Sequence, residues 1–115
     1  MAGLPNADQA IVQDEKLMGY ILDPSHKDGW PKGLFLITHG FDAANVEAVR
    51  EALLEHGRTR DVAETETTPF GTKYRVDGPM AAPDGADLQI RTVWQIDTGQ
   101  TAPRFVTMKP LPRRT

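Results

Sequence analysis

The pattern of apolar residues changes once along this chain, near residue 60, and that change constrains the fold more than any other feature. Before residue 60, apolar residues recur at the three- and four-residue spacing of helices. After it, they alternate in short runs that are separated by turn residues, as is typical of strands. Helices followed by a block of strands predict an α+β fold, with the helices packed on one face of the sheet.

The first helical stripe is short. It ends before Pro24 and predicts a helix over about residues 15–22, with Asp14 as its N-terminal cap. Residues 25–32 are polar and contain Gly and Pro, so we expect a loop there. The apolar run 33–41 is too short for its periodicity to distinguish a helix from a strand.

A longer stripe predicts a helix over residues 43–56, capped by Asp42 and ended by Gly57. Turn sequences rich in Pro and Gly divide the rest of the chain into four predicted strands, at residues 61–67, 72–79, 88–96 and 103–109. Their regular spacing and short connections predict an antiparallel meander.

The 115 residues fit a single domain, with a helical part over about 1–60, a sheet part over about 61–110 and a loose tail over 111–115. The chain has no cysteine, which excludes disulfides, thiolate metal sites and cysteine nucleophiles. Neither a membrane-spanning apolar run nor a secretory signal is visible, so we expect a cytoplasmic protein. The three histidines lack metal-ligand spacing, and we expect no metal or cofactor.

Strand alternation distributes the side chains between two faces of the predicted sheet. The core face receives Tyr74, Val76, Leu88, Ile90, Thr92, Trp94, Ile96, Val106 and Met108. The uncovered face receives Lys73, Arg75, Arg91, Thr107 and Lys109, together with Gln89, Gln95 and Phe105. The net charge of −3 argues against broad coating of nucleic acid, but a locally basic face could still bind one phosphate. The alternative is a solvated face that simply carries long polar side chains.

His26 is the strongest single candidate for chemistry. It lies in the predicted loop with Lys27, Trp30 and Lys32, and an imidazole suits acid–base catalysis near neutral pH. The indole of Trp30 could stack on a base, or it could cover the core.

Three other candidates have simpler explanations. His56 ends a predicted helix, where a cation favours the helix dipole, so a capping role is the preferred interpretation. His39 follows an apolar run and is expected to be structural or exposed. Trp94 falls on the core face and is expected to pack there.

An ordered series of motifs resembles a small uncharacterised bacterial family, the domain-of-unknown-function family 6883. The motifs include Leu4-Pro5-Asn6-Ala7-Asp8, Tyr20-Ile21-Leu22-Asp23-Pro24-Ser25-His26, Thr68-Pro69-Phe70-Gly71-Thr72-Lys73-Tyr74 and Arg91-Thr92-Val93-Trp94-Gln95-Ile96. The resemblance covers nearly the whole chain, although Gly33 stands where the family usually has Ala.

The family's setting in toxin-like and phage-associated proteins more distantly resembles the barnase–EndoU–colicin–RelE group of ribonucleases. That resemblance implies metal-independent RNA cleavage, in which the 2′-hydroxyl attacks the adjacent phosphorus. It implies that His26 is the acid or base, that Lys32 and Arg91 stabilise phosphate charge, and that Thr107 hydrogen-bonds a phosphate oxygen. Arg75 and Trp30 would add substrate contacts.

Two functions therefore compete, besides a remnant domain without chemistry. One is a ribonuclease of toxin type that acts on RNA, either in the cytoplasm or after delivery as a toxin module. The other is a non-catalytic small protein, of partner-binding or immunity type, that binds a co-encoded partner. The net negative charge favours this second function. Neither function requires a membrane.

Overall fold

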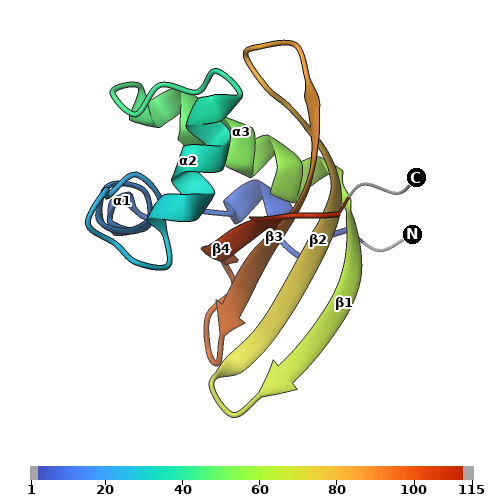
Figure 1. Cartoon of the computed structure of the whole chain (residues 1–115). Coiled ribbons are helices and arrows are strands. Elements are labelled where there is room, and N and C mark those ends of the chain that lie inside the picture. Colours follow the sequence, from blue (N-terminus) through green and yellow to red (C-terminus); the bar gives the residue numbers. More distant parts are fainter. Residues whose placement is uncertain (1–2, 113–115) are drawn as a thin grey trace.

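Helices and strands occupy separate halves of the chain, as the change of pattern near residue 60 predicts. A computed structural model describes residues 3–112 (Figure 1). The helical half consists of η1 (Ala7–Gln9), α1 (Asp14–Lys16), η2 (Leu17–Ile21), α2 (Trp30–Thr38) and α3 (Val46–Thr59). The sheet half consists of β1 (Asp61–Thr68), β2 (Gly71–Ala81), β3 (Asp87–Asp97) and β4 (Arg104–Pro110).

The sheet is an antiparallel meander in the order β1-β2-β3-β4, and the helices lie to one side of it (Figure 1). The predicted α+β class and topology are therefore confirmed. Turns rich in Gly and Pro set the strand limits, so those limits could be predicted from local sequence. Within residues 3–112, none of the helices has the length and apolar character needed to cross a bilayer.

The first predicted helix exists, but its details differ. Asp14 is the first helical residue of α1, and Gln13 before it has extended dihedral angles. The helix then widens into the π-helical turn η2, where the Leu22 amide donates to the carbonyl of Leu17 over 2.7 Å. Single π-helical turns occur often at functional sites.

The predicted loop over 25–32 is too long, because α2 begins at Trp30 and continues to Thr38. Pro31 does not prevent this, since the first turn of a helix needs no amide donor. Gly33 allows α2 to lie directly against η2: a Cβ there would overlap the carbonyl oxygen of Ile21. That close approach explains why glycine fits this position.

The second predicted helix is displaced toward the C-terminus. Asn45, rather than Asp42, caps α3, and its side-chain oxygen accepts a bond from the Ala48 amide. Gly57 does not end the helix, which continues to Thr59. Instead it lets α3 pack flat on Trp94, because a Cβ at position 57 would overlap the indole ring.

The core lies between the helices and one face of the sheet. Side chains with no exposed surface include Leu17, Ile21, Leu36, Leu53, Ile90, Trp94, Phe105 and Met108. The predicted core role of Trp94 is confirmed, as are the buried positions of Val76, Leu88, Ile90 and Thr92.

The prediction that Phe105 faces solvent is wrong. Val93 pairs with Thr107 while Trp94 pairs with Phe105, so the register shifts within β4. This bulge inserts Val106 as an extra residue and turns Phe105 toward the core. At the start of the predicted tail, the Leu111 amide donates to the carbonyl of Gln89 over 2.8 Å. Residues 113–115 of the predicted tail lie outside the described residues.

Candidate functional site

Three polar side chains from distant parts of the chain meet beside β4. The ammonium of Lys32 donates to the phenolic oxygen of Tyr20 over 2.8 Å and to Oγ1 of Thr107 over 2.7 Å. The two hydroxyl oxygens are themselves 2.9 Å apart. All three side chains are half-buried, so the triangle they form is accessible from solvent.

The fold brings these residues together through the edge of β4. Lys32 lies in the first turn of α2 and Tyr20 in the π-helical turn η2. Ile11 forms a parallel bridge with Arg104 at the start of β4, which holds the N-terminal segment against that edge. As a result, α1 and α2 both contact β4. The bulge at Val106 then sets the position of Thr107.

His26 lies against this triangle. Its ring meets the ring of Tyr20 edge-on, with 4.8 Å between centroids. Its Nδ1 accepts hydrogen bonds from the amides of Gly29, at 2.9 Å, and Asp28, at 3.2 Å. Because both amides donate, Nδ1 must be the unprotonated nitrogen of the ring. The ring proton is then on Nε2, which makes His26 a hydrogen-bond donor at that atom.

Charges around Tyr20 favour its phenolate form. Burial alone would raise the pKa of Tyr20, but the hydrogen bonds from Lys32 and Thr107 oppose it. The positive charges of Lys32 and Lys16 act in the same direction, and the resulting pKa is lowered from its ordinary value. The ammonium groups of Lys16 and Lys32 are 5.2 and 5.3 Å from the ring centroid.

We call Tyr20, His26, Lys32 and Thr107 the Tyr20 cluster. Sequence reasoning found three of its members and missed Tyr20. The available signal was Tyr20's place in the motif that ends at His26, together with its four-residue spacing from Lys16. Trp30, the predicted stacking residue, is half-buried at the start of α2, and its amide donates to the carbonyl of His26 over 3.0 Å.

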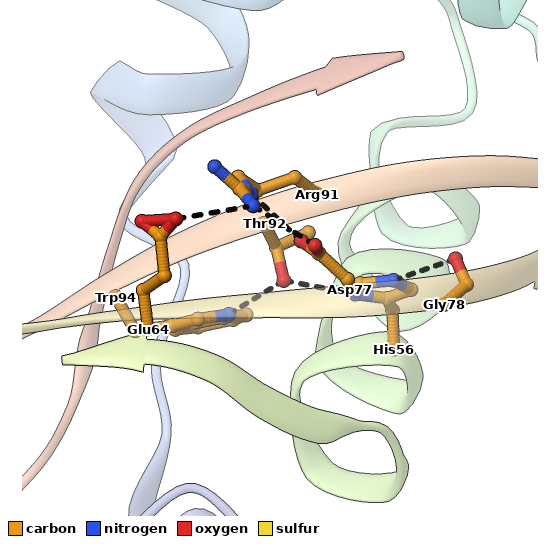
Figure 2. Close-up of polar contacts among 7 residues, drawn as sticks. All are labelled: His56, Glu64, Asp77, Gly78, Arg91, Thr92 and Trp94. Carbon is orange, nitrogen blue, oxygen red and sulfur yellow. Dashed lines mark hydrogen bonds and ion pairs between the residues drawn. The ribbon is translucent and has the colours of Figure 1, made fainter. Parts of the chain in front are cut away.

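Arg91 makes none of its observed contacts with this cluster. It binds Asp77 through two bonds of 2.7 and 2.9 Å and lies 3.7 Å from Glu64 (Figure 2). The hydrogen bond to Asp77 is the main cause that raises the pKa of Arg91 above its ordinary value. Partial burial opposes this rise, whereas the negative charges of Asp77 and Glu64 add to it. The guanidinium predicted to bind phosphate is therefore engaged by carboxylates.

The same pairing neutralises much of the face that was predicted to be basic. The β1–β2 register places Glu64 opposite Arg75 and Glu66 opposite Lys73. Arg75 binds Glu66 over 2.9 Å, so this predicted substrate contact is also paired. The prediction of a locally basic face needs correction, because it did not count the acidic side chains that β1 adds to that face.

A second polar network is buried on the other side of the sheet. His56 is 1% exposed, and its Nε2 donates to the carbonyl of Gly78 over 3.1 Å (Figure 2). The Thr92 hydroxyl contacts His56 Nδ1 and accepts from Trp94 Nε1, both over 2.8 Å. Burial is the main cause that lowers the pKa of His56. The predicted capping role is thus wrong, since the imidazole is a neutral part of the core.

The remaining histidine and the carboxylates suggest no further chemistry. His39 caps the C-terminal end of α2, and its Nδ1 lies 3.0 Å from a carboxylate oxygen of Asp84. In the part of the chain that the structure describes, no group of three or more His, Asp or Glu side chains is arranged to hold a metal ion.

Residues 3–112 match the family described as "Domain of unknown function (DUF6883)", and the chain therefore belongs to that family. Among solved structures, a chain of the "Contact-dependent growth inhibition toxin - immunity protein complex from Klebsiella pneumoniae 342" has the same fold, with a TM-score of 0.68 and 14% sequence identity. The match covers 93% of this chain and 97% of the other. No curated protein matches the sequence.

Proposed function

We propose that this DUF6883 protein is a metal-independent ribonuclease whose reaction takes place at the Tyr20 cluster. The observation that carries the proposal is the contact of one ammonium, that of Lys32, with both Tyr20 and Thr107. One ammonium, one imidazole and two hydroxyls gathered at the surface provide a base, a charge for phosphate and polar hydrogen-bonding groups.

In this mechanism Tyr20 acts as the general base. Its phenolate oxygen removes the proton from a ribose 2′-hydroxyl, and the 2′-oxygen forms a bond to the adjacent phosphorus. The bond from phosphorus to the 5′-oxygen then breaks and leaves a 2′,3′-cyclic phosphate. The departing oxygen takes a proton from solvent, and Tyr20 returns its proton to solvent.

The other members of the cluster stabilise the charge that develops on phosphate. Lys32 supplies the positive charge, and His26 donates through Nε2 to a phosphate oxygen. Thr107 holds Lys32 and Tyr20 in position. This assigns His26 as a donor rather than a base, because backbone amides occupy its Nδ1.

The fold likeness supports a toxin-type setting. The similar chain belongs to a complex of a contact-dependent growth inhibition toxin with an immunity protein. The likeness is therefore compatible with a toxin and with an immunity protein. The Tyr20 cluster favours the catalytic side.

The test is cleavage of labelled RNA in EDTA by the wild-type protein and by Tyr20→Phe and Lys32→Met. We expect each variant to lose about 10²–10³-fold in rate, the cost of removing one preorganised group. Tyr74→Phe and Lys27→Met are the matched controls, since among the described residues neither side chain has a hydrogen bond to the cluster. A 2′-deoxy substitution at the cleaved position should abolish the reaction.

The outcomes separate the activity from the site. Cleavage that survives in both cluster variants would remove the site from consideration. Absence of cleavage by the wild-type protein on several RNAs would reject the ribonuclease itself.

A second candidate is a non-catalytic, immunity-type protein that binds a partner. The observation that favours it is the pairing of Arg75 and Arg91 with carboxylates, which leaves the sheet face without its two predicted arginine contacts to phosphate. Growth arrest on expression of the wild-type chain, relieved by Tyr20→Phe, would exclude this candidate. Protection of cells against a co-encoded toxin would support it.

A further inference from the structure

A cleft of about 420 Å³ lies between α3 and the final residues of β2. Its lining comes from elements other than those that form the Tyr20 cluster. Ala52 of α3 and Met80 and Ala81 of β2 contribute apolar surface. A volume of this order is typical of sites that hold a small ligand or a few side chains of a partner.

One wall of the cleft is a strand edge. β1 pairs with β2 only as far as Asp77, whereas β2 continues to Ala81 (Figure 1). The Ala82 amide bonds the Ala86 carbonyl, so by antiparallel alternation Pro79 and Ala81 direct their backbone groups away from β3. Pro79 follows this rule, because its carbonyl accepts from Arg60 Nε over 2.8 Å. The peptide groups of Ala81 remain available on the side where β1 has ended.

The opposite wall is acidic. Glu51 and Glu55 are exposed and lie four residues apart on α3, where like charges repel. Neither carboxylate has an ion-pair partner among residues 3–112. Arg60 also lines the cleft, so the lining carries two negative charges and one positive charge.

We propose that this cleft binds an extended basic segment of a partner protein. The segment adds its backbone to the β2 edge at Ala81, as in other cases of strand addition. A Lys or Arg side chain of the segment pairs with Glu51 and Glu55, and a small apolar side chain rests on Ala52 and Met80. The proposal does not depend on catalysis at the Tyr20 cluster.

Charge decides between the occupants that a strand edge could accept. A second copy of this chain has a net charge of −3 and would bring further negative charge to the cleft. RNA would place phosphates beside Glu51 and Glu55. A basic protein segment is the occupant that complements this rim.

The probe is the blocked peptide acetyl-Arg-Val-Arg-Val-Arg-amide, titrated into isotopically labelled full-length protein and followed by amide NMR shifts. We expect binding with a Kd of about 1 mM and shifts concentrated at residues 78–81 and 51–55. The same peptide with Glu in place of Arg should not bind.

The variants test the two walls separately. Glu51→Gln/Glu55→Gln should weaken binding at least about threefold, whereas Asp8→Asn/Glu15→Gln, which removes the same charge elsewhere, should leave the Kd unchanged. Ala81→Lys should abolish binding, and its exposed position makes a folding defect unexpected. The folded amide spectrum of each variant is checked before titration.

Three results would overturn the proposal. One is no shift at residues 78–81 up to about 5 mM peptide. Another is equal weakening by the two charge-removing double variants. The third is a short single-stranded RNA that shifts the same amides, which would show that the cleft is not selective for a basic protein segment.

Discussion

The Lys32 ammonium lies 2.8 Å from the phenolic oxygen of Tyr20 and joins the π-helical turn η2 to the first turn of α2. This contact gives the protein its clearest candidate for a base. A phenol that accepts a charged hydrogen bond ionises at lower pH, because the phenolate gains more from the contact than the neutral form does.

Lys32→Met should therefore raise the pKa of Tyr20. The wild-type pKa is lowered by the bond to Lys32 and by its charge, and the variant loses both while burial remains. Ultraviolet titration in a Tyr74→Phe background isolates Tyr20, and Lys27→Met serves as the control. An unchanged Tyr20 titration in Lys32→Met would contradict the proposed role of this contact.

Gly57→Ala should destabilise the protein although alanine favours helices. The added Cβ would overlap the Trp94 indole, and overpacking of a core costs about 1–3 kcal/mol. Gly19→Ala is the matched control, since nothing lies within 4 Å of a Cβ there. Urea unfolding should show a loss for the first variant and no loss for the second. Equal stabilities would mean that α3 moves away from Trp94 at little cost.

Stability should fall as the pH drops below about 6.5, the ordinary pKa of histidine. Burial lowers the pKa of His56, so below that pH the unfolded chain binds a proton that the native protein resists. The free energy of unfolding then decreases with falling pH, by at most about 1.4 kcal/mol per unit for one such group.

His56→Gln isolates that effect. The variant keeps His26 and His39, so the difference between the two pH profiles belongs to His56. At neutral pH we expect a loss of about 1–3 kcal/mol, because buried partners such as Thr92 lose a hydrogen bond. Parallel pH profiles for the two proteins would show that another group causes the acid sensitivity.

Arg91 and Asp77 should couple energetically. Their bidentate contact is partly shielded, with 18% and 28% of the side chains exposed, and we expect a coupling of about 1 kcal/mol. A double-mutant cycle with Arg91→Met and Asp77→Asn measures it by urea unfolding. In the same variants RNA cleavage should persist, since Arg91 is held by carboxylates. A loss of cleavage in Arg91→Met without loss of stability would show that Arg91 takes part in the reaction.

Local sequence was sufficient for the strands and for most of the core. Turns that contain Gly and Pro fixed the strand limits, and two-residue alternation placed Val76, Leu88 and Trp94 correctly. Alternation failed at Phe105, because a bulge depends on how neighbouring strands pair and leaves no mark in local periodicity.

Helix ends were harder to predict, since tertiary packing decided them. Gly33 and Gly57 look like breaks in the chain, yet both lie inside helices that press against Ile21 and Trp94. A glycine needed for close approach has the same sequence signature as one needed for a turn.

The sequence by itself determined the order of helices and strands, and it predicted three members of the candidate site. Only the tertiary structure decided which charges meet. Cross-strand register turned Arg75 and Arg91 toward Glu66 and Asp77, while packing of η2 and α2 beside β4 brought Lys32 to Tyr20. Hydrogen bonds and close ion pairs need specific distances and angles, so they depend on register and packing that local sequence does not specify.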